Sequence, residues 1–538
     1  MATPTPVLGS WIGPQARFLT LIRRWSAPAW GAIGTTSLFL GITCWWLTQD
    51  RSVPIFDAGL HLSFAYEVRH QLAAGHFVKA LTLSIPYPPL AYLVGAAGFA
   101  LGGNSVAAPI IAENFVFVPL LALGCYHVGR MAFSPLAGLL AVIFALGSPL
   151  IMAQFHVFMI DAPETAMVAA SLWAVLATDN FSRIWISGLA GLAVGLGLLA
   201  KEPFAFFIVG PVVVTSIRGG INAWRGITIF VLATLLVALP WYLHEFSTVK
   251  TIGLGSIQAA GAKVGGDIAP ARYSLDNFTW YFWNILNYQL YLPLFIFSMT
   301  GWIWTLVGFV RRRSVSRLAP EIAAGAFVGW LAITLTFTHD TRYSMPLLVY
   351  AAVFATGWIT KLQGKLRLAV VAALILVALA NTLGTTFGLG RAVEYELPGA
   401  NRSSRQAPGK LTIFVNTGFL VGAPVRNGNL LPVLRALKRS GVNVLVLSLQ
   451  FQNEADFSGS GLIALAQIAG LEPGDWAGQP LTGLPDQDAV LEHRAIKSGE
   501  PPPCVKLSDG SGVWIVLGNP QAPDAEFFCP TRRPQFYG

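Results

Sequence analysis

The sequence predicts a polytopic α-helical membrane protein with a soluble α/β domain at its carboxy-terminal end. Of its 538 residues, 54% are hydrophobic and only 11% are charged, whereas a soluble globular chain carries about 25% charged residues. The mean hydropathy is +0.59. Apolar runs recur between residues 30 and 388, and most can cross a hydrocarbon core of roughly 30 Å as a helix. This pattern excludes a soluble protein with a single core.

Eleven apolar runs are predicted to span the membrane. The run at 30–47 follows three arginines and has no convincing small-residue cleavage site, so it is interpreted as a signal anchor. The stretch at 89–102 is short and bounded by prolines and glycines, which favours a juxtamembrane or re-entrant helix. The predicted spans are residues 29–48, 106–127, 134–151, 157–177, 184–200, 203–218, 225–243, 283–310, 321–338, 343–360 and 367–386.

The basic residues predict the orientation of these spans. Short cytoplasmic loops of membrane proteins carry an excess of Lys and Arg. With a cytoplasmic amino terminus, five basic loops fall on the cytoplasmic side and the carboxy-terminal domain lies in the periplasm or outside the cell. We therefore expect a multi-pass protein of the plasma (inner) membrane. Because the formal charge of +9 serves this orientation, nucleic-acid binding is not expected. The five loops hold Arg130; Arg183; Arg218 and Arg225; Arg311, Arg312, Arg313 and Arg317; and Lys361, Lys365 and Arg367.

Three regions are predicted along the chain: a cytoplasmic amino terminus at 1–28, a transmembrane domain at 29–388 with an outer loop at 49–105, and a soluble domain at 389–538. After residue 388 the composition changes to short alternating elements. Strands are predicted at 411–416, 442–450 and 512–519, and amphipathic helices at 429–441 and 460–470. This order favours a small α/β domain. Cys504 and Cys529 suit a disulfide in an oxidising compartment, and two free buried thiols are the alternative.

Acidic side chains mark two places on the predicted outer face. Asp57 follows the first span directly, and His61 lies one helical turn later, so a carboxylate and an imidazole share a face. Asp161 enters an otherwise apolar span just after His156, and a carboxylate at membrane depth is a functional hypothesis by default. The alternatives are a solvated loop acid for Asp57 and a helix-dipole partner for Asp161.

Cations and aromatic rings fall on the same predicted side. Lys201 ends a glycine-rich helix, where a snorkelling lysine is the alternative. Arg342 shares one tight turn with His339 and Tyr343, and a guanidinium can donate two parallel hydrogen bonds to a phosphate. Tyr87 stands among three prolines that shape a wall of the outer loop, and Arg272 lies in an outer loop rich in aromatic residues. Acids that activate a hydroxyl and cations that hold a phosphate suit transfer from a lipid phosphate.

The order of these motifs resembles the GT-C membrane glycosyltransferases, in particular protein O-mannosyltransferases and lipid A aminoarabinose transferases. The resemblance covers roughly residues 30–386. It rests on FDAGLH (56–61), PPL (88–90), MIDAP (159–163), GLGLLAK (195–201) and RYSMP (342–346). Two departures bear on metal use and on lipid A as acceptor: Ala58 follows the first Asp where many relatives have Glu, and Pro86 and Tyr87 stand where the aminoarabinose transferases carry Glu-Lys.

The resemblance implies a role for each matching residue. Asp57 would be the general base that activates the acceptor hydroxyl, and Asp161 the second family acid, which positions the acceptor or a metal. Lys201 and Arg342 would stabilise the departing lipid phosphate, in a pocket that His339 and Tyr343 complete. Apart from the resemblance, His61, Tyr87, His156 and Arg272 are expected to line the substrate site, because they fall on the same predicted outer side. The donor would be a polyprenyl-phosphate sugar, the acceptor an unidentified envelope component, and no cofactor is required with certainty, although a divalent metal stays open.

Two other classes of function fit some of these features. A transporter or flippase of an envelope precursor would also carry charged residues near helix ends, but its ionisable groups are expected at the bilayer midplane between broken helices. A scaffold protein whose tail binds a partner leaves the acids and cations on one side unexplained.

Overall fold

The computed structural model describes most of the helical part of the chain and selected elements of the tail. It describes residues 26–83, 87–251, 270–311, 313, 315–335, 339–397, 410–418, 421–425, 430–439, 442 and 459–471, and the backbone of the short strands at 263–264, 267–268, 444–447, 472–473, 489–495, 505–506, 511–517 and 526–527. Pro86, Cys504, Cys529 and the amino-terminal residues 1–25 lie outside the described residues.

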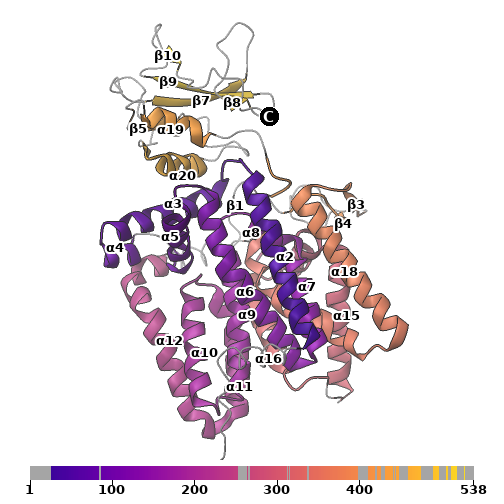
Figure 1. Cartoon of the computed structure of the whole chain (residues 1–538). Helices are drawn as coiled ribbons and strands as arrows, with labels where there is room; N and C mark the ends of the chain where they lie inside the picture. Colours follow the sequence, from indigo (N-terminus) through magenta and orange to yellow (C-terminus); the bar gives the residue numbers. More distant parts are fainter. Residues whose placement is uncertain are drawn as a thin grey trace, which may run out of the picture.

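A large body of helices carries the smaller carboxy-terminal part at one end (Figure 1). Three further helices, α3, α4 and α5, lie between the two parts on one side of the molecule (Figure 1). The helices are α2 (Ala27–Gln49), α3 (Phe56–Ala73), α4 (Phe77–Leu81), α5 (Leu90–Gly102), α6 (Ala107–Ala132), α7 (Pro135–Leu146), α8 (Pro149–Phe155), α9 (Asp161–Ala177), α10 (Ile184–Leu198), α11 (Phe204–Gly219), α12 (Trp224–His244), α14 (Leu275–Asn284), α15 (Tyr291–Val310), α16 (Ala319–Leu335), α17 (Leu347–Gly357) and α18 (Gly364–Phe387), with helical turns η1 (Gly220–Ala223), η2 (Ile285–Leu290), η3 (Thr341–Ser344) and η4 (Trp358–Lys361).

Every predicted span coincides with helical structure, and the short stretch at 89–102 forms α5. Among the described residues, four helical segments are long and apolar enough to cross a membrane, and α7 with α8, bent by 64°, would make a fifth. Several of the other helices are shorter than the roughly 20 residues that a perpendicular crossing needs. The number of eleven spans therefore stays a prediction.

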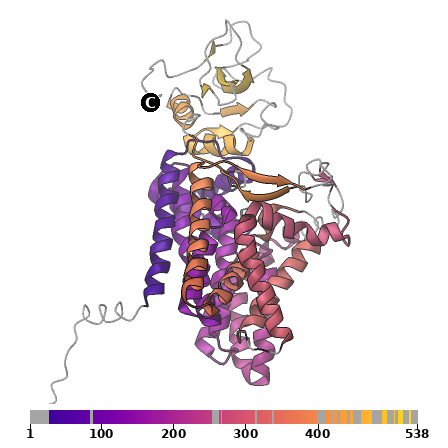
Figure 2. The same cartoon turned by 90° about the vertical axis from the view of Figure 1, so that its right-hand side faces the viewer.

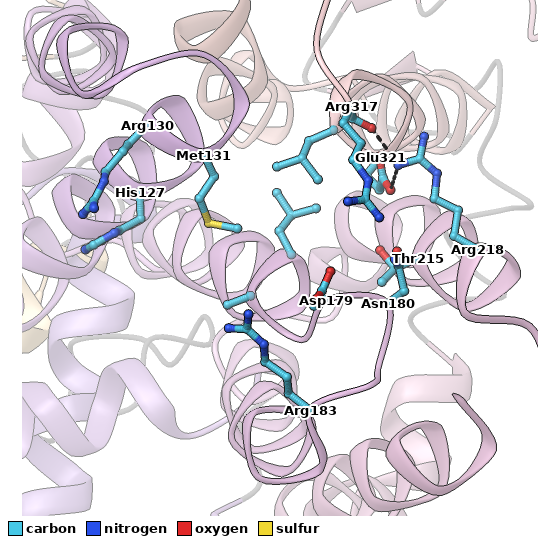
Figure 3. Close-up of a pocket in the computed structure, with 13 residues that line it drawn as sticks. His127, Arg130, Met131, Asp179, Asn180, Arg183, Thr215, Arg218, Arg317 and Glu321 are labelled. Atoms are coloured by element: carbon cyan, nitrogen blue, oxygen red, sulfur yellow. Dashed lines mark hydrogen bonds and ion pairs between the residues drawn. The ribbon is translucent and has the colours of Figure 1, made fainter. Parts of the chain in front are cut away.

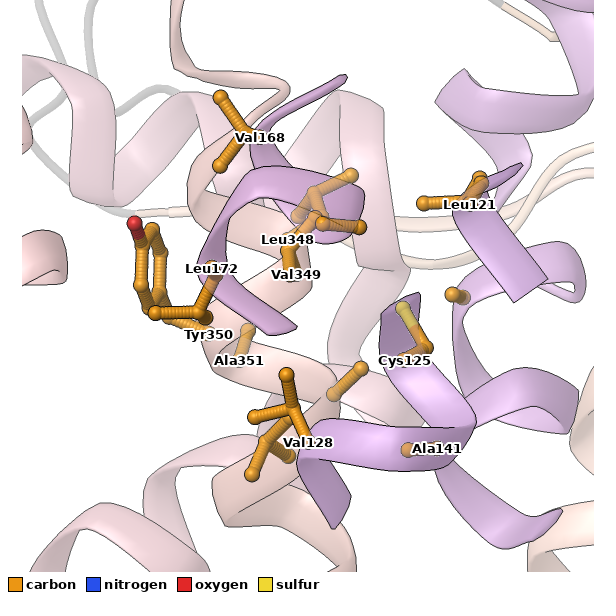
Figure 4. Close-up of a cluster of buried hydrophobic side chains, with 14 of the residues drawn as sticks. Leu121, Cys125, Val128, Ala141, Val168, Leu172, Leu348, Val349, Tyr350 and Ala351 are labelled. Atoms are coloured by element: carbon orange, nitrogen blue, oxygen red, sulfur yellow. The ribbon is translucent and has the colours of Figure 1, made fainter. Parts of the chain in front are cut away.

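The core of the helical body lies between α6, α7, α9 and α17 (Figure 4). Leu121 and Cys125 of α6, Leu172 of α9 and Val349 of α17 are fully buried there. Small residues let these helices approach closely, as is usual in membranes: a Cβ on Gly124 would overlap the backbone of Ala169. This packing holds the middle of α9, the helix that begins with the predicted acid Asp161.

The tail contains a mixed sheet and two helices, α19 (Leu431–Arg439) and α20 (Gly459–Ala469). The strand order is β10-β9-β7-β5-β6, with β8 on β9; β5 runs parallel to β6 and β7, and β9 runs antiparallel to β7. The strands are β5 (Val444–Leu447), β6 (Glu472–Pro473), β7 (Ala489–Ala495), β8 (Val505–Lys506), β9 (Ser511–Leu517) and β10 (Glu526–Phe527). Among the described elements of the tail, helices and strands alternate from α19 to β6, and only strands follow.

One predicted strand does not join the sheet of the tail. The strand predicted at 411–416 forms β4 (Lys410–Phe414), which pairs antiparallel with β3 (Val393–Glu396), directly after α18, and not with the sheet of the tail. The pair extends from the helical body as a separate hairpin (Figure 2). A second short hairpin, β1 (Lys263–Val264) with β2 (Asp267–Ile268), lies in the loop before α14. The strand and the order β4, α19, β5, α20 are as predicted, but β4 does not join the sheet that contains β5, because pairing partners follow from tertiary position and not from local pattern.

Candidate functional site

Asp57 and Arg342 meet although 285 positions separate them in the chain. Asp57 lies in the first turn of α3, and Arg342 lies in η3, which Asp340 caps by accepting a hydrogen bond from the Arg342 backbone N–H at 2.9 Å. The Arg342 guanidinium donates from Nη2 to Asp57 Oδ2 at 2.8 Å and to Asp340 Oδ2 at 2.7 Å, and from Nε to Asp340 Oδ1 at 3.0 Å. Asp340 thus orients the arginine that holds Asp57.

Lys201 forms a second ion pair, deeper in the same end of the helical body. Its Nζ lies 2.6 Å from Asp161 Oδ1 and 3.8 Å from Glu164 Oε2, and all three side chains are buried. Lys201 comes from the end of α10, and both acids come from the first turn of α9. The ammonium also lies 4.6 Å from the centre of the Tyr343 ring, a distance at which the ring face attracts a cation.

Both cations keep their charge in this setting. Burial alone lowers the pKa of Lys201, but the carboxylates of Asp161 and Glu164 outweigh it, and the pKa is raised. Burial likewise lowers the pKa of Arg342, and the hydrogen bonds of Asp340 with the charges of Asp161 and Asp57 raise it above its ordinary value. The two groups are therefore permanent positive charges for an anion.

His61 and Tyr87 lie against this cluster. His61 is buried, its Nδ1 lies 2.8 Å from the Tyr92 hydroxyl, and its ring meets the Tyr87 ring edge-on at 5.2 Å. Burial lowers the pKa of His61 to about 4, although the charge of Asp57 opposes the shift. Burial also raises the pKa of Tyr87 to about 12. At neutral pH His61 is therefore uncharged and Tyr87 is a hydroxyl donor.

Two of the residues expected at the site stack on aromatic rings, and a third makes a backbone hydrogen bond. His156 is buried and stacks on Trp46 with ring centres 4.4 Å apart. His339 precedes Asp340 in the sequence, and its ring stacks on the Tyr281 ring with centres 5.4 Å apart. Arg272 accepts a hydrogen bond from Asn277 through its backbone oxygen. The expectation that these three residues line the site stays a prediction.

Exposure divides the cluster into two layers. The Asp57 side chain is 49% exposed, whereas that of Arg342 is 12% exposed, and those of Lys201 and Asp161 are 6% and 2% exposed. Arg342 engages only one oxygen of Asp57, Oδ2, so Oδ1 can face a substrate. An accessible carboxylate above buried cations can take a proton from a hydroxyl while the cations hold an anion.

Helix α20 of the tail packs on α3, and sequence reasoning missed this contact. Ser460 Oγ donates to the backbone oxygen of Phe56 at 2.5 Å, and Ser63 Oγ donates to Gln467 Oε1 at 2.7 Å. Phe56, the residue before Asp57, has a φ of 43°, a conformation that costs a non-glycine residue free energy. A Cβ on Gly59 would overlap the backbone of Gly461. The tail therefore holds the turn that presents Asp57. In the sequence, the small residues at 459–461 are the signal that could have indicated a close helix contact.

No group of three or more His, Cys, Asp or Glu side chains in the described part of the chain is arranged to hold a metal ion. Asp57 and Asp161 are each paired with a cation. The residues present supply positive charge to the site from Arg342 and Lys201.

Comparisons with known proteins bear on the fold of this chain. Residues 87–244, less than a third of the chain, match the family described as dolichyl-phosphate-mannose-protein mannosyltransferase. The structure of ArnT from Cupriavidus metallidurans bound to undecaprenyl phosphate superposes with a TM-score of 0.50 at 16% identity, over 66% of this chain and 71% of that one. The chain has the GT-C fold. The GT-C resemblance of the sequence is thereby confirmed.

Other solved structures superpose with lower TM-scores. The apo form of the same ArnT gives a TM-score of 0.47 at 18% identity, over 62% of this chain and 60% of that one. An Archaeoglobus fulgidus oligosaccharyltransferase gives 0.46 at 11% identity, over 82% of this chain and 64% of that one. No curated protein sequence matches the chain. Within the GT-C fold of this chain, the segment that matches the mannosyltransferase family contains Asp161 and Lys201, while Asp57 and Arg342 lie outside it.

Proposed function

We propose that this chain transfers a sugar from a polyprenyl-phosphate donor to a hydroxyl of a lipid, glycan or protein acceptor, with Asp57 as general base. The observation that carries the proposal is the half-exposed carboxylate of Asp57, held by Arg342 next to the buried Lys201 at one end of a GT-C helical body. The ArnT structure with undecaprenyl phosphate bound supports a lipid-phosphate donor for this fold.

The reaction follows from the two layers of the site. The acceptor hydroxyl gives its proton to Asp57 while its oxygen forms a bond to the anomeric carbon of the sugar. The bond between that carbon and the phosphate oxygen breaks, and its electron pair leaves with the polyprenyl phosphate. Lys201 and Arg342 stabilise the negative charge that develops on the phosphate, which lowers the barrier because both charges are in place beforehand. Asp161 holds Lys201, and Asp340 holds Arg342.

The proposed orientation places the site on the outer side of the plasma membrane. Arg130, Arg183, Arg218 and Arg317 gather at the opposite ends of α6, α10, α11 and α16, as the positive-inside rule predicts for a cytoplasmic face. Helix α9 has 17 residues, so its two ends lie about 25 Å apart. The acids and cations of the site then face the periplasm or the exterior, together with the tail.

A transporter is the second class of function, and the position of the charges argues against it. Transport sites are expected near the bilayer midplane at broken helices. In this chain Asp161 begins α9 and Lys201 follows the end of α10, so the ion pair lies at one end of these helices.

The proposal is tested with purified protein, a panel of polyprenyl-phosphate sugars and envelope lipid extract, by measuring released polyprenyl phosphate. Asp57→Asn should abolish release while the protein stays folded, because the amide cannot accept the proton. Asp276→Asn is the matched control, since Asp276 is another exposed acid in the first turn of a helix, α14. Release by the wild type and the control alone supports the transferase. Unchanged release by Asp57→Asn would refute the role of Asp57, and substrate flux in sealed vesicles without release would favour the transporter.

A further inference from the structure

A hollow rich in charged residues lies where α6, α9 and α11 end and α10 and α16 begin, at the end of α9 opposite Asp161. Figure 3 shows the residues that line it. It has a volume of about 540 Å³ and is lined by the ends of α6, α9, α10, α11 and α16. Four arginines line it, Arg130, Arg183, Arg218 and Arg317, against two acids, Asp179 and Glu321. We call it the arginine pocket.

The acids do not neutralise the arginine pocket. Glu321 is buried and is engaged by Arg218, whose Nη1 lies 2.6 Å from Glu321 Oε1. Among the described residues, no ion pair joins Arg130, Arg183 or Arg317 to an acid. These arginines come from three different elements, α6, the start of α10 and the turn before α16. Arginines that only set orientation need not converge on one hollow.

A buried hydroxyl on the pocket wall lacks a partner. Thr215 of α11 lines the pocket, is 1% exposed, and its Oγ1 forms no hydrogen bond with the described residues. A buried polar group without a partner costs free energy. Figure 3 shows Thr215 beside Arg218 and Glu321, facing the space that Arg183 and Arg317 also border. An oxygen-rich ligand in the pocket would satisfy this hydroxyl.

An apolar groove adjoins the arginine pocket. It has a volume of about 570 Å³, runs between α2 and α6, and is lined by residues such as Ile33, Leu40 and Leu123. His127 and Arg130 line both hollows. From Ser26 to Leu40 the groove follows α2 for about 20 Å, which is longer than one leaflet of a hydrocarbon core of roughly 30 Å.

We infer that the two hollows together bind one anionic phospholipid, its phosphate among the arginines and one acyl chain along α2 and α6. The charge of the pocket selects an anionic headgroup, because guanidinium groups donate charge-assisted hydrogen bonds to phosphate. The apolar groove selects a lipid over a soluble phosphate. In the proposed orientation this end faces the cytoplasmic leaflet, where anionic lipids are recognised by basic pockets between helices. The site is separate from the transfer reaction and does not depend on it.

The test measures lipid retention by native mass spectrometry and the thermal midpoint of the purified full chain with added lipid. The lipids are phosphatidylglycerol and phosphatidylcholine with the same acyl chains, and glycerol 3-phosphate is the soluble probe. The pocket variant is R183Q/R317Q, whose arginines are exposed. The matched control is R311Q/R313Q, which removes two arginines near the same end that do not line the pocket. Thr36→Trp narrows the groove without changing charge, since Thr36 lines it.

We expect phosphatidylglycerol to bind the wild type and R311Q/R313Q, and to bind R183Q/R317Q about tenfold or more weakly, because two charge-assisted hydrogen bonds are lost. Phosphatidylcholine should not be retained. Thr36→Trp should weaken the binding of phosphatidylglycerol and leave the binding of glycerol 3-phosphate unchanged. Equal binding by the two double variants would overturn the inference in favour of general surface attraction. Glycerol 3-phosphate that binds as tightly as the lipid would overturn it in favour of a soluble anion.

Discussion

Replacing Lys201 by methionine should separate the structural role of the buried ion pair from its role in catalysis. Lys201 Nζ lies 2.6 Å from Asp161 Oδ1, and the side chains are 6% and 2% exposed. Without the ammonium, Asp161 is a buried charge without a partner. Breaking one partner of a buried pair costs about 3 to 5 kcal/mol, so we expect a lower thermal midpoint in detergent. The double variant with Asp161→Asn should recover a large part of this loss, because it removes both charges.

Activity should respond differently from stability. Loss of one preorganised charge that stabilises a transition state typically costs about a hundredfold to a thousandfold in kcat. Both Lys201→Met and the double variant should therefore transfer sugar at less than about a hundredth of the wild-type rate, measured as polyprenyl phosphate release from folded protein. If the double variant regains activity together with stability, Lys201 is only structural. If Lys201→Met alone keeps wild-type stability, the buried ion pair itself is refuted.

Three further outcomes follow from the same geometry. Arg342→Lys should keep a positive charge yet lower transfer about tenfold or more, because a compact ammonium lacks the planar fork with which the guanidinium binds Asp57 and both oxygens of Asp340. An unchanged kcat would show that the fork is unnecessary. Gly461→Ala should lower kcat by displacing the turn at Asp57, since the new Cβ would overlap Pro54. Gly34→Ala is the control and should leave kcat unchanged, because its Cβ meets nothing within 4 Å. Equal kcat values for the two variants would show that the tail does not position the site. Burial lowers the pKa of His61 from 6.5 to about 4, so as the pH drops the unfolded chain binds a proton before the folded chain does. The free energy of unfolding should therefore fall between pH 6.5 and pH 4, by up to about 3 kcal/mol. His61→Asn should flatten this part of the pH dependence of the thermal midpoint, and an unchanged slope would contradict the role of His61.

The local properties of the chain were enough to predict the helical body. Apolar runs between basic loops predict membrane helices because the requirement to satisfy backbone hydrogen bonds in lipid is local, and each predicted run coincides with helical structure. The motifs around Asp57, Asp161, Lys201 and Arg342 were sufficient for the GT-C resemblance, which the structural comparison confirms. The same local signals did not determine the number of spans, because length and apolar composition do not distinguish one bent span from two separate segments, as at the 64° bend between α7 and α8.

Tertiary structure alone decided which side chains meet. The stacking of His156 on Trp46 and of His339 on Tyr281 could not be seen in the sequence. The strand predicted at 411–416 forms β4, and only the structure shows that β4 pairs with β3 and not with the sheet that contains β5. Strand pairing and ring stacking depend on which surfaces come together after distant segments pack.

By itself, then, the sequence determined that this is a membrane protein with acids and cations at helix ends and a tail of a different composition. The structure decided that Arg342 holds Asp57 across 285 positions of chain, that Lys201 pairs with Asp161, and that Ser460 of the tail holds the turn before Asp57. Hydrophobicity and charge are properties of each residue, and their pattern can be seen along the chain. A contact is a property of two residues that the whole fold brings together, and only the packed structure contains it.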